Sequence, residues 1–301
     1  METIYATLST PGQTNEDIVI AGPSWAFVLD GATAPAGIPS GCIHDVTWFV
    51  RHLGGHLARL LTLADDQPVT DLLADALRCT GREHADTCDL DNPSSPNATA
   101  VIVRERGDQM DYLALSDSPL VLDRDGEVQV IKDSRTERLP DYSPSGVARV
   151  RNQPGGFWVA GAQPHAAHEA VTGSVPLASV RRAALLSDGA ARLVERFNIL
   201  SWNGLLEVLE HQGPAELIAR TRHAEEAERA AEREGRRGKR YDDATAVYLV
   251  TSPWCGRTTA PGWVRSAGRG MRRTGTATKR SSRHADQPPH GHQEHGHSTE
   301  T

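Results

Sequence analysis

The chain is 301 residues long and acidic, with a formal net charge of −7, which argues against a nucleic-acid-binding surface along its whole length. Its 38% hydrophobic and 24% charged residues are typical of a folded protein that buries a sizeable core. No apolar run reaches the roughly 18 to 20 residues of a membrane-spanning helix, and Met1-Glu2-Thr3 does not begin a signal peptide. We therefore expect a cytoplasmic, monomeric protein that binds neither membranes nor nucleic acid.

The cysteine content points to a reducing compartment. The four cysteines are too few for a disulfide framework in a chain of this length; they are Cys42, Cys79, Cys88 and Cys255. Cys79, His84 and Cys88 suggest a zinc site, but a fourth donor is missing and the spacing is irregular. The sequence therefore favours a loop in which these three residues are incidental.

The first third of the chain predicts short strands followed by helices. Strands are expected over residues 4–9, 18–21 and 25–29, with Gly-Pro and Pro-Gly turns between them. Apolar residues then recur at helical spacing from about 44 to 63, and a second helix is expected over 69–79.

The middle of the chain predicts an antiparallel meander, and the part after it predicts mostly helices. The meander strands are expected over 98–103, 110–115, 120–123 and 128–132, and two later strands over 183–186 and 244–251. Helices are expected over 190–197, 202–211 and 214–234. Grouping of strands with strands and helices with helices indicates an α+β fold with antiparallel sheets.

Composition changes sharply near residue 252. From there to Thr301 the chain is rich in Gly, Ser, Thr, Arg and His, with almost no aliphatic residues. Such a segment cannot bury enough apolar surface to offset its ordering entropy. We therefore divide the chain into a folded domain, residues 1–251, and a disordered basic and histidine-rich tail, residues 252–301.

Four short acidic signatures lie at the edges of the predicted strands: Asn15-Glu16-Asp17, Asp30-Gly31, Ser187-Asp188-Gly189 and Asp242-Asp243. Each signature alone is compatible with a simple β-turn. Together they predict a cluster of carboxylates, and the repulsion within such a cluster is normally relieved by a hard divalent cation. Oxygen ligands favour Mg²⁺ or Mn²⁺ over zinc.

The order of these signatures resembles the metal-dependent protein phosphatases of type 2C, which are serine/threonine phosphatases. Asn97-Ala98-Thr99-Ala100 at a strand entry, Asp117-Ser118, and Asp242-Asp243-Ala244-Thr245 before the last strand add to the resemblance, which extends over residues 1–251. It implies a four-layer αββα sandwich, and hydrolysis of phosphoserine and phosphothreonine in phosphorylated proteins by a water that bridges two Mn²⁺ or Mg²⁺ ions.

The resemblance also implies a role for each acidic residue. Asp30 would bridge both ions and the carbonyl of Gly31 would help to hold the second, while Asp188 and Asp242 would complete the shell of the first. Glu16 and Asp17 would act mostly through water. Asp117 would hold a possible third ion.

The chain departs from the family where the substrate phosphate is usually gripped. Gly12 stands in place of a frequent arginine, Ala32 follows the Asp-Gly pair in place of histidine or methionine, and Gly-Asp-Ser-Arg appears as Ser116-Asp117-Ser118-Pro119. Three functions therefore remain open: a protein phosphatase, a weak or inactive family member that binds phosphoproteins or acts as a regulatory module, and a phosphomonoesterase for small molecules.

Overall fold

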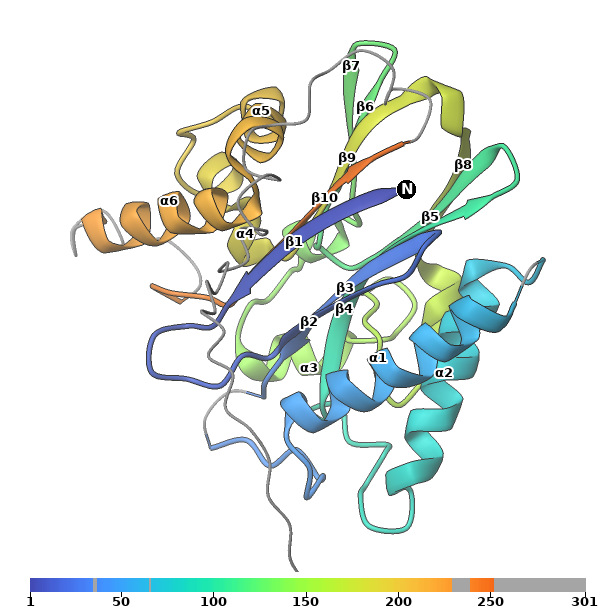
Figure 1. Ribbon diagram of the computed structural model, residues 1–301. Coiled ribbons are helices and arrows are strands. Elements are labelled where there is room, and N and C mark those ends of the chain that lie inside the picture. Colours follow the sequence, from blue (N-terminus) through green and yellow to red (C-terminus); the bar gives the residue numbers. More distant parts are fainter. Residues whose placement is uncertain (35–36, 65, 229–238, 252–301) are drawn as a thin grey trace, which may run out of the picture. The chain divides into compact units, whose positions relative to one another are not determined.

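Two antiparallel sheets of five strands each form the centre of the fold (Figure 1). The computed structural model describes residues 1–34, 37–64, 66–228 and 239–251. The first sheet has the order β1 (Glu2–Leu8), β10 (Ala244–Val250), β9 (Val180–Leu186), β6 (Leu120–Arg124) and β7 (Glu127–Ile131). The second has the order β2 (Asp17–Ala21), β3 (Trp25–Ala32), β4 (Asn97–Arg106), β5 (Gln109–Leu115) and β8 (Val171–Pro176).

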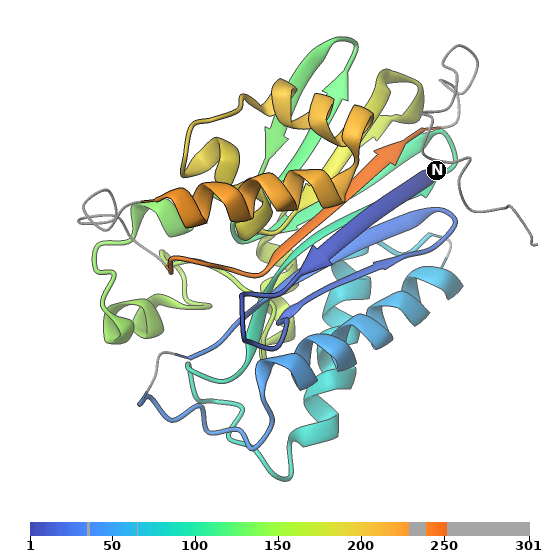
Figure 2. The ribbon, with the colours of Figure 1, turned by 60° about the vertical axis from the view of Figure 1, so that its left-hand side comes forward.

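Helices cover the outer face of each sheet (Figures 1 and 2). The second sheet is covered by α1 (Val46–Leu63) and α2 (Val69–His84), and the first by α4 (Asp188–Glu195), α5 (Trp202–Gln212) and α6 (Pro214–Ala227). The predicted α+β class and four-layer αββα sandwich are therefore confirmed.

Side chains that alternate between the two faces of each strand form three hydrophobic cores between the four layers. In β3, Phe27 and Leu29 pack against α1 and α2, while Val28 faces the other sheet. Successive side chains of a strand point to opposite faces, so a central strand buried on both sides has no polar alternation. A third cluster, which includes Leu186 and Leu205, lies between the first sheet and its helices.

Local signals fix where α1 begins and how it packs. The Asp45 carboxylate accepts a hydrogen bond from the amide of Trp48 at 2.7 Å and thus caps the helix. Phe49, Leu53 and Leu57 recur at helical spacing and are buried against the second sheet. The predicted helix over 44–63 is therefore present, beginning two residues later.

The predicted meander is wrong. β4 pairs with β5 and β6 pairs with β7, but β5 and β6 belong to different sheets. The chain crosses between the sheets at residues 116–119, where Ser116 has a φ of 70° and Pro119 lacks an amide donor. Sequence spacing alone cannot distinguish such a crossing from a hairpin.

Two elements were not predicted, and some expectations fall outside the described residues. Strand β8 and the short helix α3 (Pro144–Val150) had no clear periodic signal, and α2 extends five residues past the predicted end. The expected tail at 252–301 and part of the predicted helix over 214–234 lie outside the residues that the structure describes.

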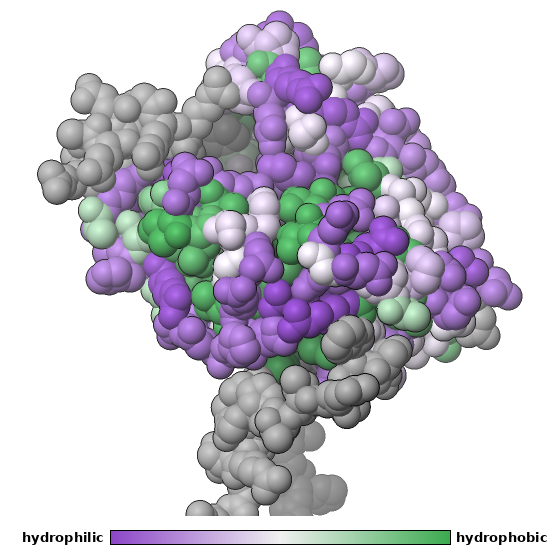
Figure 3. Space-filling view, turned by 90° about the horizontal axis from the view of Figure 1, so that it is seen from above, coloured by the Kyte–Doolittle hydropathy of each residue, from purple (hydrophilic) through white to green (hydrophobic). Residues whose placement is uncertain are grey.

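The surface carries the polar residues that its sequence pattern predicts. On the face seen in Figure 3, hydrophilic residues cover most of the described surface and hydrophobic ones form small groups near the middle. Among the described residues, no helix has the length and apolar character needed to cross a bilayer.

Candidate metal centre

Five aspartates from both sheets meet at one end of the sandwich. Asp17 begins β2 and pairs in register with Asp30 of β3, and the amide of Asp188 donates to Asp30 Oδ2 at 3.3 Å across the two sheets. Asp188 lies two residues after the end of β9, and Asp242 lies two residues before the start of β10, which is antiparallel to β9. Asp117 lies where the chain crosses between the sheets. The register thus places all five carboxylates at the same end.

Burial and mutual repulsion oppose ionisation of this cluster. Burial raises the pKa of Asp30 well above its usual value, and the charges of Asp17, Asp188, Asp242 and Asp117 raise it further. Burial and the nearby acidic charges raise the pKa of Asp188 to about 8. Asp117 is shifted upward as well, because burial raises its pKa. Such carboxylates ionise only when a positive charge compensates them.

Asp17 is the clearest sign that the cluster suits a cation. Neither of its buried carboxylate oxygens has a partner with good hydrogen-bond geometry. Burial raises the pKa of Asp17 to about 7, although the hydroxyls of Thr245 and Ser187 are close enough to oppose part of that rise. A buried carboxylate without full partners, beside four others, matches the oxygen donors that Mg²⁺ and Mn²⁺ prefer.

Asp242 is held in place by cations from neighbouring elements. Arg192, one turn after Asp188 on α4, donates to Asp242 Oδ2 at 2.6 Å and to the buried Glu225 at 2.7 Å. Lys239 Nζ lies 3.4 Å from Asp242 Oδ1. Arg192 therefore orients one oxygen of Asp242 and leaves the other facing the exposed side of the cluster, where Lys239 lies.

Glu16 lies at the rim of the cluster, and a residue without a predicted role fixes it there. The Glu16 side chain accepts a hydrogen bond from the Thr33 hydroxyl, and its amide donates to Asp243 Oδ2 at 2.5 Å. The other oxygen of Asp243 accepts from the amide of Thr10 at 2.6 Å. Asp243 thus ties the segment from Thr10 to Glu16 to β10, a role for which only the repeated acid at 242–243 gave a signal.

The glycines of the Asp-Gly and Ser-Asp-Gly motifs are required by close backbone approach. A Cβ at Gly31 would lie 2.6 Å from the carbonyl oxygen of Glu16, and one at Gly189 would lie 1.9 Å from that of Asp243. Neither glycine has a positive φ. These glycines therefore let the acidic segments pack against each other.

Neither Gly12 nor Ala32 supplies a cation to the cluster. Gly12 has a φ of 76° with no atom near its missing side chain, and Ala32 ends β3 opposite Asn97. Lys239 is a cation beside the cluster that the sequence did not single out. Burial opposes its charge, but Asp242, Glu16 and Asp30 outweigh this and raise the pKa of Lys239.

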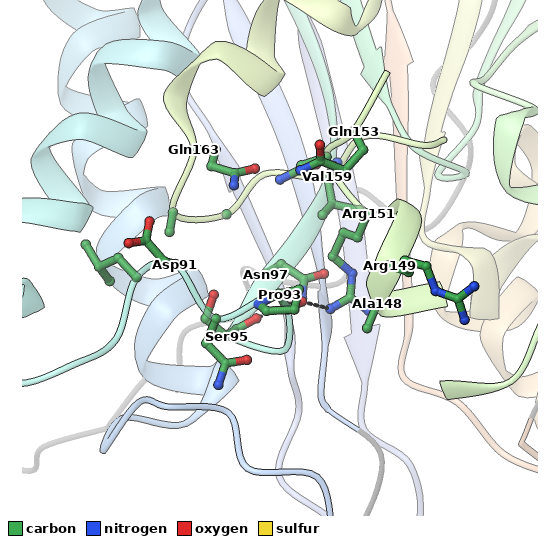
Figure 4. A pocket seen from close by; sticks show the side chains of 15 residues that line it. Asp91, Pro93, Ser95, Asn97, Ala148, Arg149, Arg151, Gln153, Val159 and Gln163 are labelled. Carbon is green, nitrogen blue, oxygen red and sulfur yellow. Dashed lines mark hydrogen bonds between the residues drawn. The ribbon is translucent and has the colours of Figure 1, made fainter. Parts of the chain in front are cut away.

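A polar cavity of about 250 Å³ lies beside the end of β4 (Figure 4). One wall is the segment around Ser95 and Asn97, and the other includes Arg149, Arg151 and Gln163. Arg151 donates to the carbonyl of Pro93 at 2.6 Å and so holds the two walls together. None of the five aspartates lines this cavity. The turn before Phe157 and Trp158 forms part of its surroundings, and both rings are buried.

A family model described as protein phosphatase 2C matches residues 12–232 of the chain. This range is most of the domain that contains the two sheets and the five aspartates. The chain therefore belongs to the protein phosphatase 2C family.

Solved structures with the same fold are distant in sequence. The Staphylococcus aureus serine/threonine phosphatase Stp1 is 12% identical with a TM-score of 0.53, over 83% of this chain and 95% of that one. The Mycobacterium tuberculosis serine/threonine phosphatase PstP/Ppp is 21% identical with a TM-score of 0.50, over 82% and 97%. A C. elegans sex determining protein is 16% identical with a TM-score of 0.53, over 83% of this chain but only 65% of that one. No curated protein sequence matches the chain.

Proposed function

We propose that this protein is a metal-dependent phosphatase that hydrolyses phosphoserine and phosphothreonine in proteins. The observation that carries the proposal is the convergence of five aspartates at one end of a protein phosphatase 2C fold. Four of them have raised pKa values, and both carboxylate oxygens of Asp17 lack a hydrogen-bond partner. A site of this kind is stable in its ionised form only with bound cations.

The residues have distinct proposed roles. Asp30 lies between Asp17 and Asp188 and is suited to hold two Mn²⁺ or Mg²⁺ ions, with Asp188 and Asp242 on one side and the carbonyl of Gly31 on the other. Glu16 and Asp17 support the second ion, and Asp117 is the candidate for a third. The bound ions would activate a water molecule and stabilise negative charge on the phosphoryl oxygens.

The remaining residues of the site position the acidic side chains or could contact the substrate phosphate. Arg192 fixes the orientation of Asp242, and Asp243 fixes the segment that carries Glu16. No protein nucleophile is needed for such chemistry. Lys239, exposed at the rim, can donate to a phosphate and replaces the arginine that is missing at Gly12.

Gly12 and Ala32 favour a second candidate, a family member that binds phosphoproteins with little or no turnover. A comparison of substrates separates the candidates: a phosphothreonine peptide, p-nitrophenyl phosphate and small phosphorylated metabolites, each with Mn²⁺. We expect the peptide to have the highest kcat/KM, and Asp30→Asn and Asp188→Asn to abolish turnover. Asp108→Asn, in the turn between β4 and β5 at the other end of the sheet, is the control. Peptide binding without turnover would support the second candidate, and preference for a metabolite would support a phosphomonoesterase.

A further inference from the structure

Four sulfur and nitrogen donors, distinct from the five aspartates, converge where α1 begins and α2 ends. Cys42 and His44 precede α1, His84 is the last residue of α2, and Cys88 follows α2. One donor atom from each lies within 4.8 Å of those of the other three. Of the trio considered from sequence, His84 and Cys88 take part and Cys79 does not. The missing donors come from the Cys-x-His pair at 42–44.

The sulfur-to-nitrogen distances within this cluster match tetrahedral coordination. Zinc bonds of about 2.3 Å to sulfur and 2.0 to 2.1 Å to nitrogen place neighbouring ligands roughly 3.3 to 3.8 Å apart. Cys42 Sγ lies 3.4 Å from His84 Nδ1 and 3.6 Å from His44 Nδ1, and Cys88 Sγ lies 3.4 Å from His44 Nδ1. The two sulfurs are 2.9 Å apart, and both cysteines are free. A small outward movement of the sulfurs completes the tetrahedron.

Neighbouring residues orient the donors. His84 is 3% exposed, its Nδ1 faces Cys42, and its Nε2 has no hydrogen-bond partner. The Trp48 ring stacks on His44 with centroids 4.0 Å apart and lies 5.1 Å from the His84 ring. Rings held in this way keep their nitrogens directed at one point, as ligands of a bound ion require.

The backbone already brings the two donor segments together. The amide of Asp89 donates to the carbonyl of Gly41 at 2.8 Å, and Asn92 Nδ2 donates to the carbonyl of Pro39 at 3.2 Å. A bond through an ion between Cys42 and Cys88 would close a loop of 46 residues that contains all of α1 and α2. Closing a long loop restricts the unfolded chain and so stabilises the fold.

We propose that Cys42, His44, His84 and Cys88 bind one zinc ion in a structural site. Two thiolates and two imidazoles select zinc, whereas the five aspartates select Mg²⁺ or Mn²⁺. All four coordination positions are filled by the protein, which is typical of a structural rather than a catalytic zinc ion. The bound ion would hold the ends of α1 and α2 together over the second sheet. The zinc proposal does not depend on whether the protein is a phosphatase.

The test uses the full-length protein, measured for zinc content and then reconstituted with Co²⁺. We expect one zinc per chain, and a cobalt derivative with intense tetrahedral bands and thiolate-to-cobalt charge transfer. Cys42→Ser and Cys88→Ser should weaken zinc binding by at least about 100-fold, since even changes around metal ligands cost 10 to 100-fold. Cys79→Ser, on α2 but outside the cluster, is the matched control and should bind as the unaltered protein does.

The cobalt spectrum of the wild-type protein tests for a tetrahedral site with thiolate ligands even if the serine variants fail to fold. The C-terminal segment carries imidazoles and one thiol, Cys255, so the same charge-transfer bands should persist in Cys255→Ser. Weak octahedral bands with freely reactive thiols would overturn the proposal. A Cys42–Cys88 disulfide, identified as a cross-linked peptide in an unreduced digest of the purified protein, would overturn it as well.

Discussion

Ser116 adopts a backbone conformation that its side chain disfavours. Its φ of 70° lies in the left-handed region, where the family motif has glycine. Such a non-glycine residue costs about 1 kcal/mol or more. We expect Ser116→Gly to raise the free energy of unfolding by about 1 kcal/mol in urea titrations, after the larger unfolded-state entropy of glycine is included. Ser116→Ala keeps the Cβ and should show no such gain; equal stability of the two variants would contradict this explanation.

Lys239 is the side chain that we expect to compensate for Gly12. It lies at the exposed rim of the aspartate cluster, so it can contact the phosphate without disturbing the buried carboxylates. A charge-assisted contact made equally in the ground and transition states affects binding and not turnover. Lys239→Ala should raise KM for a phosphopeptide by roughly 3 to 10-fold with little change in kcat, and Lys239→Arg should restore it. An unchanged KM, or a loss confined to kcat, would exclude this role.

At the residue scale, the sequence predicted the acidic residues of the site but not the residues that hold them in position. Asp30 and Asp188 lie in short motifs that can be read locally. The role of Asp243 depends on a contact with Thr10, more than 200 residues away in the sequence. The role of Lys239 depends on the conformation of the loop that brings it to Asp242. The Cys-x-His pair was overlooked because its partners lie 40 residues further along the chain, beyond α1.

At the scale of elements, the junction between β9 and α4 packs closely against the segment before β10. Gly189 lies at that junction, with the carbonyl of Asp243 where a Cβ would be. Because backbone must move to admit a methyl group, Gly189→Ala should lower the free energy of unfolding by about 2 to 3 kcal/mol and weaken Mn²⁺ binding. Calorimetry with and without Mn²⁺ measures both effects.

Gly55 is the matched control for this substitution. It is exposed in the middle of α1, and no atom lies within 4 Å of its missing side chain. Alanine there should stabilise the protein by roughly 0.5 to 1 kcal/mol through helix propensity. If Gly189→Ala proved as harmless as Gly55→Ala, the close approach of the two segments would not be a feature of the folded protein.

Helices and strands with strong hydrophobic periodicity were predicted well, whereas the pairing of strands within each sheet was not. The helix over residues 44–63 and the last strand were expected from their apolar patterns. Strand β8 was missed because Gly173 and Pro176 interrupt it and most of its side chains are exposed. The assignment of β5 and β6 to different sheets depends on the conformation at residues 116–119, which strand length and turn composition do not specify.

For the whole molecule, the aspartate cluster links stability to pH. The folded-state pKa values of Asp17 and Asp188, about 7 and 8, exceed those of an unfolded chain, near 4. Between pH 4 and 8 the folded state therefore binds more protons, so the free energy of unfolding falls as pH rises. Urea titrations in buffer free of Mg²⁺ and Mn²⁺ should show this fall, and saturating Mn²⁺ should reduce it.

Asp30→Asn provides the control for this pH dependence. It removes a central charge of the cluster but leaves the proposed zinc ligands intact, so any proton release at the thiols is common to both proteins. The fall in stability between pH 5 and 8 should be smaller in the variant. A metal-free wild-type protein that became more stable across that interval would contradict the proposed electrostatics.

The central claim is that the aspartate cluster is a cation site at which phosphate esters are hydrolysed. It is tested most directly by phosphate release from a phosphothreonine peptide, measured against Mn²⁺ concentration for the wild-type protein and for Asp30→Asn. We predict saturable, Mn²⁺-dependent release by the wild-type protein that falls by at least about 100-fold in the variant. Release that is independent of Mn²⁺, or equal in the two proteins, would contradict the claim.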